Sequence, residues 1–204
     1  MKHPKLHAFA LSAALALACA GQALAESRYS FAPDGTGTVT ATAKVNLSVV
    51  VPKLILLKVG SSNDAVDTVS WATSLSIPGT PATTPTATVT NSALPWDGNA
   101  PTVSTTPTGN AISVAAWTNA GNATINCAVG DWSAAGGPTT SEFTVATSGT
   151  LTHPGTNLGT CTSTSLSSNA LATGTWTYTL NSAGGDLWKA GTFKNTVTYT
   201  ASGV

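Results

Sequence analysis

The sequence predicts an all-β protein organised as an antiparallel β-sandwich with Greek-key features. Apolar and polar residues alternate with a period of two in several segments, turn signals separate these segments, and no segment has convincing helical periodicity. Charged residues make up only 8% of the 204 residues, whereas hydrophobic residues reach 42%, so the chain can build a core. A small β-barrel is the alternative arrangement of the same strands.

The first 25 residues are typical of a secretory signal peptide. A basic start with Lys2 and Lys5 precedes a short apolar run, and Ala23-Leu24-Ala25 fits a cleavage site. The run is shorter than the ~20 residues of a transmembrane helix, and no later stretch approaches that length. We therefore expect residues 26–204 to be one exported domain, secreted or displayed at the cell surface.

Cysteine usage agrees with an oxidising compartment. Beyond the leader only Cys127 and Cys161 remain, and two cysteines in an exported chain predict one disulfide. Two free buried thiols are the alternative. Cys19 follows a leader segment that resembles a lipid-attachment site with its leucine one place off, so lipid anchoring at Cys19 is not favoured.

Alternation is clearest at the two ends of the exported chain. The apolar face of residues 38–51 consists of Val39, Ala41, Ala43, Val45, Leu47, Val49 and Val51. The last strand is expected to carry Phe193, Asn195, Val197, Tyr199 and Ala201 on one face. Further strands are expected over residues 54–59, 69–77, 111–117, 123–129, 141–145 and 175–180.

A long segment near residues 78–109 interrupts this pattern. It is rich in Pro, Thr and Ser, and only residues 87–89 indicate a brief strand. We interpret it as a surface loop, because each flank alone would make a very small domain. A linker between two domains is the alternative.

The side chains that catalysis or metal binding would use are scarce. His153 is the only histidine beyond the leader, and its surroundings predict a solvated loop rather than a catalytic triad. Only two glutamates are present, so a facing carboxylate pair would need two aspartates that meet in space. Asp64 and Asp67 lack calcium-loop spacing and are interpreted as turn caps. We expect no enzyme activity, no cofactor and no metal site, and the neutral net charge predicts no nucleic-acid partner.

Six tryptophans are present, and five of them fall into two groups, while Trp117 is assigned to neither. Trp71 and Trp176 alternate with other apolar residues and are expected in the core. Trp96, Trp132 and Trp188 lie beside Pro, Gly or Asp in predicted turns. An exposed indole can stack on a sugar ring, so these three are candidate sugar-stacking residues; the alternative is that they plug the ends of the sandwich.

The alternating ends also bear on how strands pair. Sheet edges are templates for pairing with another chain, and this chain has few charges with which to defend them. Residues 38–51 can fold back as the chain's own first strand, or insert into a neighbouring subunit as a donor strand. The second arrangement is head-to-tail and does not close on itself, so it builds a filament.

The C-terminal segment has a glycine, an aromatic residue, alternating apolar residues and a late tyrosine, in a pattern formed by Gly191, Phe193, Val197 and Tyr199. In this pattern it resembles the terminal strand of secreted bacterial pilin-like sandwiches, which include chaperone–usher fimbrial subunits and spore-coat-U-type proteins. Residues 38–57 are similar to the start of some fimbrial major subunits. The chain departs from the pattern in the five residues after Tyr199 and in the late position of both cysteines.

The resemblance implies an immunoglobulin-like sandwich that serves as a structural subunit of a bacterial surface fibre or coat. It implies self-assembly with identical subunits through residues 38–51, and an edge strand near Val197 and Tyr199 that faces a neighbour. A periplasmic chaperone and an usher are the further partners it implies. The alternative is a monomeric secreted module that binds a surface glycan through Trp96, Trp132 or Trp188.

Overall fold

The computed structural model describes residues 26–61 and 64–204, so the expected leader, including Cys19, lies outside the described residues. The chain divides into two units, Met1–Val51 and Pro52–Val204. The nine strands and three short 3-10 helices of the described residues all lie in the second unit. All strand pairs are antiparallel, which confirms the all-β class. No described helix is long and apolar enough to cross a membrane.

Four strands form the larger sheet, in the order β1 (Ile55–Val59), β4 (Ala111–Thr118), β8 (Ala172–Leu180) and β6 (Phe143–Gly149). Strand β4 buries Ile112 and Val114, while Ser113 between them faces outward. This period of two follows from the pleat of a strand, which directs successive side chains to opposite faces. Ile112 lies opposite Trp176 of β8 in the register of the sheet.

Three strands form the second sheet, in the order β7 (Ser163–Leu166), β5 (Ala123–Val129) and β9 (Val197–Ser202). The side chains of β9 alternate between half-buried and exposed, as the sequence predicts for Val197, Tyr199 and Ala201. Tyr199 lies opposite Cys127 of β5. Most residues of this sheet are small or β-branched, which suits a pleated surface with one buried face.

One hydrophobic core collects side chains from both sheets. Trp176 of β8 and Ile125 of β5 are completely buried, and both belong to the same contiguous cluster. The indole N–H of Trp176 donates to the carbonyl of Leu151 at 2.9 Å, so the polar end of this large side chain is satisfied. The inner faces of the two sheets therefore share one core.

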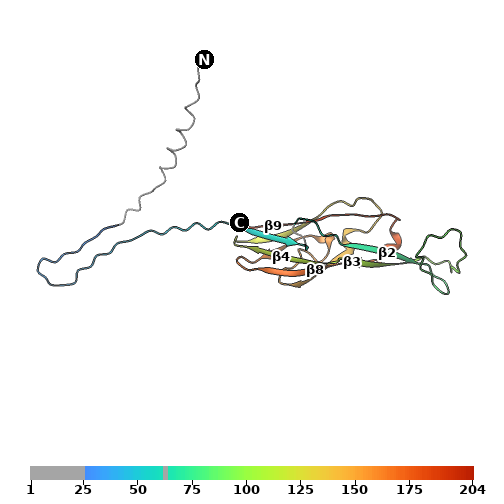
Figure 1. Cartoon of the computed structure of the whole chain (residues 1–204), viewed down its shortest axis with the longest axis horizontal. Helices are drawn as coiled ribbons and strands as arrows, with labels where there is room; N and C mark the ends of the chain where they lie inside the picture. The colour runs from blue at the N-terminus through green and yellow to red at the C-terminus, as the bar shows by residue number, and fades with distance from the viewer. Residues whose placement is uncertain (1–25, 62–63) are drawn as a thin grey trace, which may run out of the picture. The chain divides into compact units, whose positions relative to one another are not determined.

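Two further strands, β2 (Ser70–Ser76) and β3 (Thr102–Thr108), pair as a separate ribbon. The ring of Trp71 in β2 meets the ring of Phe143 edge-on, with 5.1 Å between centroids, and this contact ties the ribbon to the core. Residues 77–101 connect the two strands. In Figure 1 this loop, drawn in green, extends beyond the ribbon at one end of the unit Pro52–Val204.

Strand β3 lies inside the segment 78–109 for which the sequence predicts a loop. Its pattern is obscured by Pro107, because proline cannot donate to a ladder and argues against a strand. The brief strand expected at residues 87–89 is not formed. Because β2 and β3 pair with each other, residues 77–101 are the connection within a hairpin.

The disulfide expected from the two remaining cysteines is present. Cys127 of β5 is bonded to Cys161, which follows the 3-10 helix η2 (Leu158–Thr160), and their Cα atoms are 5.3 Å apart. The bond ties the loop after β6 to the centre of the second sheet.

Removing this disulfide by combining Cys127→Ala with Cys161→Ala is expected to lower the free energy of unfolding. The bonded residues are 34 positions apart. A loop of that length corresponds to roughly 3–4 kcal/mol in the chain-entropy model. Denaturant titration measures the loss, and wild-type protein under reducing conditions is the matched control. A loss below about 1 kcal/mol would contradict this account of the bond.

Candidate functional site

Two sheet edges lie next to each other on one side of the fold. β1 ends the four-stranded sheet and pairs only with β4, whereas β9 ends the three-stranded sheet and pairs only with β5, within the described residues. Parts of the two edge strands lie close to each other. Each edge therefore presents a row of backbone N–H and C=O groups with no strand partner in the described chain.

The core is less well covered along these two edges than elsewhere. The inward side chains of β1 and β9 are only half-buried: Ile55, Leu57, Val59, Val197, Tyr199 and Ala201. On the opposite edges, β6 buries Phe143 and Val145, and β7 buries Leu166. Because β1, β9, β6 and β7 are all edge strands, their position at an edge does not by itself explain this difference in burial. The inward side chains of β1 and β9 therefore lack a neighbouring segment that would shield them from solvent, whereas those named on β6 and β7 are shielded.

The chain before β9 continues the exposed edge. Thr196 and Lys194 accept backbone hydrogen bonds from Gly130 and Ser133, so pairing extends beyond the strand proper. Gly191 and Phe193, expected on the terminal strand, lie in this preceding segment rather than in β9. The ring of Phe193 sits so close to Gly137 that a Cβ there would be 2.3 Å from it, which requires glycine at that position.

A buried polar chain fixes the side chain of Tyr199 in β9. Its hydroxyl lies 2.8 Å from Nε2 of His153 and 2.6 Å from the hydroxyl of Tyr178 on β8. The sequence predicts a solvated histidine, and that prediction is wrong, because the His153 residue is only 7% exposed. Its ring is packed edge-on against Trp176, with 4.9 Å between centroids. No sequence signal indicates this position, because the loop that carries His153 has no periodicity.

The donors and acceptors in this series of hydrogen bonds follow from the carbonyl group at its end. Nδ1 of His153 lies 2.6 Å from the carbonyl oxygen of Gly155, and a carbonyl only accepts, so Nδ1 carries the proton. Nε2 then accepts from Tyr199, and Tyr199 accepts from Tyr178. Burial lowers the pKa of His153, and the Gly155 carbonyl opposes this shift. Burial also raises the pKa of both tyrosines. The group is therefore a neutral structural network with both histidine nitrogens engaged.

Stability is expected to fall as the pH drops below about 6.5, the ordinary pKa of histidine. The lowered pKa of His153 means that the unfolded chain takes up its proton at a higher pH than the folded chain. Stability from the neutral histidine is thus fully present above pH 6.5 and is lost as the pH falls toward the folded-state pKa. Thermal unfolding between pH 5 and pH 7.5 measures this, with His153→Gln as the variant in which the dependence should flatten. If the His153→Gln variant keeps the same dependence of melting temperature on pH, His153 is not the source of that dependence.

The segment expected as a donor strand has no secondary structure in its own unit. No strand is assigned between residues 26 and 51, and residues 33–51 are exposed. The apolar face includes Val45, Leu47 and Val49, which are 79%, 88% and 84% exposed. An extended chain rises about 3.3 Å per residue, so residues 39–49 match the length of the edge formed by residues 191–202.

Residues 52–54, at the start of the second unit, are tied to the end of β4. Asn119 donates from its side chain to the Pro52 carbonyl and accepts from the Leu54 N–H, each at 2.7 Å. The hydroxyl of Thr118 donates to the Leu54 carbonyl at 2.9 Å. These bonds continue the β1–β4 pairing toward the N-terminus.

The three candidate sugar-stacking tryptophans lie in different surroundings. Trp96 is 60% exposed in the loop of residues 77–101, and its indole N–H donates to the Asn99 carbonyl. Trp132 is half-buried against Phe143, with 5.6 Å between ring centroids, and its buried Nε1 finds no acceptor among the described residues. Trp188 is half-buried and lines a cavity. The three therefore do not form one surface.

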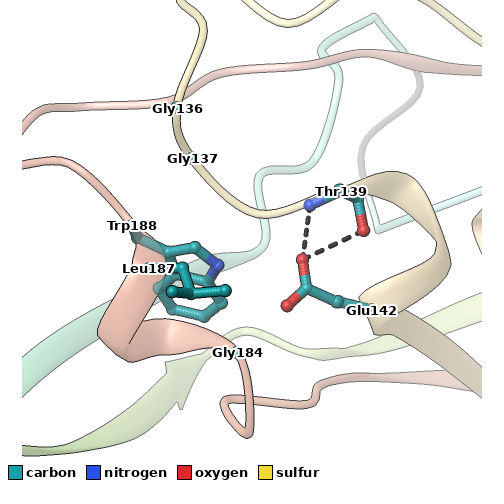
Figure 2. Close-up of a pocket in the computed structure, with 7 residues that line it drawn as sticks. All are labelled: Gly136, Gly137, Thr139, Glu142, Gly184, Leu187 and Trp188. Carbon is teal, nitrogen blue, oxygen red and sulfur yellow. Dashed lines mark hydrogen bonds between the residues drawn. The ribbon is translucent and has the colours of Figure 1, made fainter.

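The cavity at Trp188 has a volume of about 290 Å³. Its lining consists of Gly136, Gly137, Thr139, Glu142, Gly184, Leu187 and Trp188. Figure 2 shows the side chains of Trp188 and Leu187 on one side and the carboxylate of Glu142 on the other. That carboxylate accepts from the backbone N–H of Thr139 at 2.5 Å and from its hydroxyl at 3.0 Å. The cavity thus joins an aromatic ring to a fixed anionic acceptor.

The arrangement of the described residues also bears on whether a metal site is present. No cluster of three or more His, Cys, Asp or Glu side chains with metal-binding geometry occurs within residues 26–61 and 64–204. Asp67 accepts from the backbone N–H of Ser61 at 2.9 Å and also from its hydroxyl, as a turn-capping residue does.

Comparison of the chain with protein-family models, with curated proteins and with solved structures found no match.

Proposed function

We propose that this protein is an exported structural subunit of a bacterial surface fibre or coat, and that it assembles by β-strand complementation. In this proposal the unit Pro52–Val204 is an immunoglobulin-like sandwich that lacks one strand between β1 and β9. Residues 38–51 of a second, identical subunit supply that strand. The observation that carries the proposal is that the inward apolar side chains of β1 and β9 are only half-buried, whereas Phe143, Val145 and Leu166 on the opposite edges are buried.

The donor segment supports the proposal through its chemistry. Its apolar residues alternate, so an inserted strand would bury one face against the core and keep Thr, Asn and Ser in water. The free backbone groups of the two edges would gain ladder partners along the same strand. A row of exposed Val and Leu side chains on an isolated segment is otherwise an aggregation hazard.

Insertion into a second subunit is favoured over self-insertion by residues 52–54. A strand that folds back beside β1 would need a reversal at these residues. That reversal would break the hydrogen bond from the Asn119 side chain to the Pro52 carbonyl and the one from the Leu54 N–H to Asn119. Exchange between subunits keeps those bonds. Because donor and acceptor surfaces differ, the contact is head-to-tail and extends into a filament.

The free edges also need a partner before assembly. We propose a periplasmic chaperone that covers β1 and β9 during export, and an usher that passes subunits to the growing fibre. The disulfide between Cys127 and Cys161 supports an oxidising compartment, as the bacterial periplasm provides.

Titration of the truncated chain 52–204 with a peptide of residues 36–51 tests the acceptor half of the proposal. Isotope labelling of the truncated chain lets amide signals report where the peptide binds. We expect saturable binding, the largest shifts in β1 and β9, and a higher melting temperature. A peptide with Val45→Asp and Leu47→Asp is the control and should not bind. Shifts confined to the β2–β3 ribbon, or no binding at all, would overturn the proposal.

The cavity at Trp188 favours a second candidate function, glycan binding. A sugar ring could stack on the indole, with Glu142 accepting from its hydroxyls. Glycan-array binding that is lost in Trp188→Ala and kept in Trp96→Ala would support it. Equal loss in both variants, or no binding by the wild-type protein, would count against this cavity.

A further inference from the structure

The loop between β2 and β3 presents a group of hydroxyls that the rest of the fold leaves unused. Every residue from 84 to 102 is exposed. The side chains of Thr84, Thr86, Thr88 and Thr90 make no hydrogen bond to the described residues. Elsewhere threonine hydroxyls hold the fold together, as Thr118 does through the carbonyl of Leu54. The four loop hydroxyls are therefore accessible.

The backbone around these hydroxyls favours an extended conformation, which would suit binding of the segment by a modifying enzyme. Pro81 and Pro85 fix their own φ angles and bias the preceding residues toward extended conformations. Ala87 separates Thr86 from Thr88, so little side-chain bulk lies beside these two hydroxyls. No strand or helix is assigned between residues 84 and 95.

The charge of this region is unusually low for its exposure. Between residues 68 and 110 the sequence contains one charged side chain, Asp97. Val89 and Trp96 are 66% and 60% exposed in the same loop. Exposed surfaces normally depend on charge to stay soluble and to avoid apolar association. Neutral sugars attached to hydroxyls would hydrate this loop without adding charge, as in stalks rich in Ser, Thr and Pro.

We propose that the loop of residues 77–101 is a site of O-linked glycosylation, with Thr84, Thr86, Thr88 and Thr90 as acceptors. The co-substrate is a sugar diphosphate, carried by a nucleotide or a lipid, and a separate transferase catalyses the step. Oγ1 of the threonine bonds to the anomeric carbon as the carbon–oxygen bond to the diphosphate breaks. The diphosphate leaves with the electron pair, and the hydroxyl proton passes to a base of the transferase.

Mass spectrometry of the protein from its own host tests this proposal. No Lys or Arg lies between Lys58 and Lys189, so cleavage before aspartate is used after reduction of the disulfide. Cleavage before Asp67, Asp97 and Asp131 separates the peptide 67–96, which contains the four threonines, from the peptide 97–130, which contains β3. We expect added mass in whole multiples of a monosaccharide residue on peptide 67–96 and none on peptide 97–130. Alkaline β-elimination should remove it.

Two matched variants complete the experiment. Replacing the four loop threonines with valine is expected to abolish the added mass. Replacing Thr102, Thr106 and Thr108, which are exposed but lie in β3, should leave it unchanged. Host-derived protein with the mass of the unmodified chain would overturn the proposal. So would added mass that persists in the four-residue variant or that lies on peptide 97–130. Fibre formation is scored separately, so failure here leaves the proposed assembly unaffected.

Discussion

Placing two aspartates on the apolar face of the donor segment is expected to abolish fibre formation. Val45 and Leu47 are 79% and 88% exposed in the unassembled chain and would be buried between β1 and β9 of a neighbour. Burial of one such side chain contributes about 1.5–3 kcal/mol, and an unpaired carboxylate in its place costs several kcal/mol more. We expect Val45→Asp with Leu47→Asp to weaken strand binding by more than about a thousandfold. Sedimentation of assembled material measures the loss.

The control for this variant has the same charge and lies on the other face. Asn46→Asp with Ser48→Asp also adds two carboxylates to residues 38–51, on the side that would stay in water. Fibres should form from this variant with little change. Equal loss in both pairs would mean that charge itself, rather than burial of one face, prevents assembly, and it would contradict strand complementation.

The largest effect on stability is expected from Trp176→Ala. The side chain is completely buried, packs against the rings of His153 and Tyr199 with 4.9 Å between centroids, and donates to Leu151. Truncation of a buried tryptophan costs about 3–5 kcal/mol. The orphaned Leu151 carbonyl moves the expected value toward the upper end. Chemical denaturation followed by circular dichroism measures the change, which is a large share of the ~5–15 kcal/mol of an ordinary domain.

Trp117→Ala is the matched control. Trp117 lies on the outer face of β4, opposite the exposed Leu56, and is half-buried. Its truncation is expected to cost about 1 kcal/mol, as is usual for a residue outside the core. If the two tryptophan variants lose similar stability, the placement of the core on the inner face of β8 is contradicted.

Much of the fold follows from period-two alternation. Strand β4 buries Ile112, Val114 and Ala116, as the pattern predicts, and Trp176 lies in the core for the same reason. Such strands are predictable because one apolar face against one polar face leaves a single way to bury the apolar side. The disulfide was predictable because only two cysteines follow the expected leader.

Other parts depend on contacts that no local pattern encodes. Strand β7 has only four residues and lies in a segment that shows no periodicity, so its pairing with β5 is set by tertiary structure. His153 is buried because its loop reaches Tyr199, which lies 46 positions away in the sequence. Residues 38–51 carry the clearest alternation and yet form no strand in their own unit. Alternation specifies that a face should be buried, but it does not specify which molecule buries it.

Electron microscopy of the chain 26–204 and the truncated chain 52–204, prepared in parallel, distinguishes strand exchange from self-insertion. We expect fibres from the chain 26–204, and folded particles that do not polymerise from the truncated chain. Discrete monomers from the chain 26–204, together with an unfolded truncated chain, would contradict strand exchange, because residues 38–51 would then complete their own sandwich.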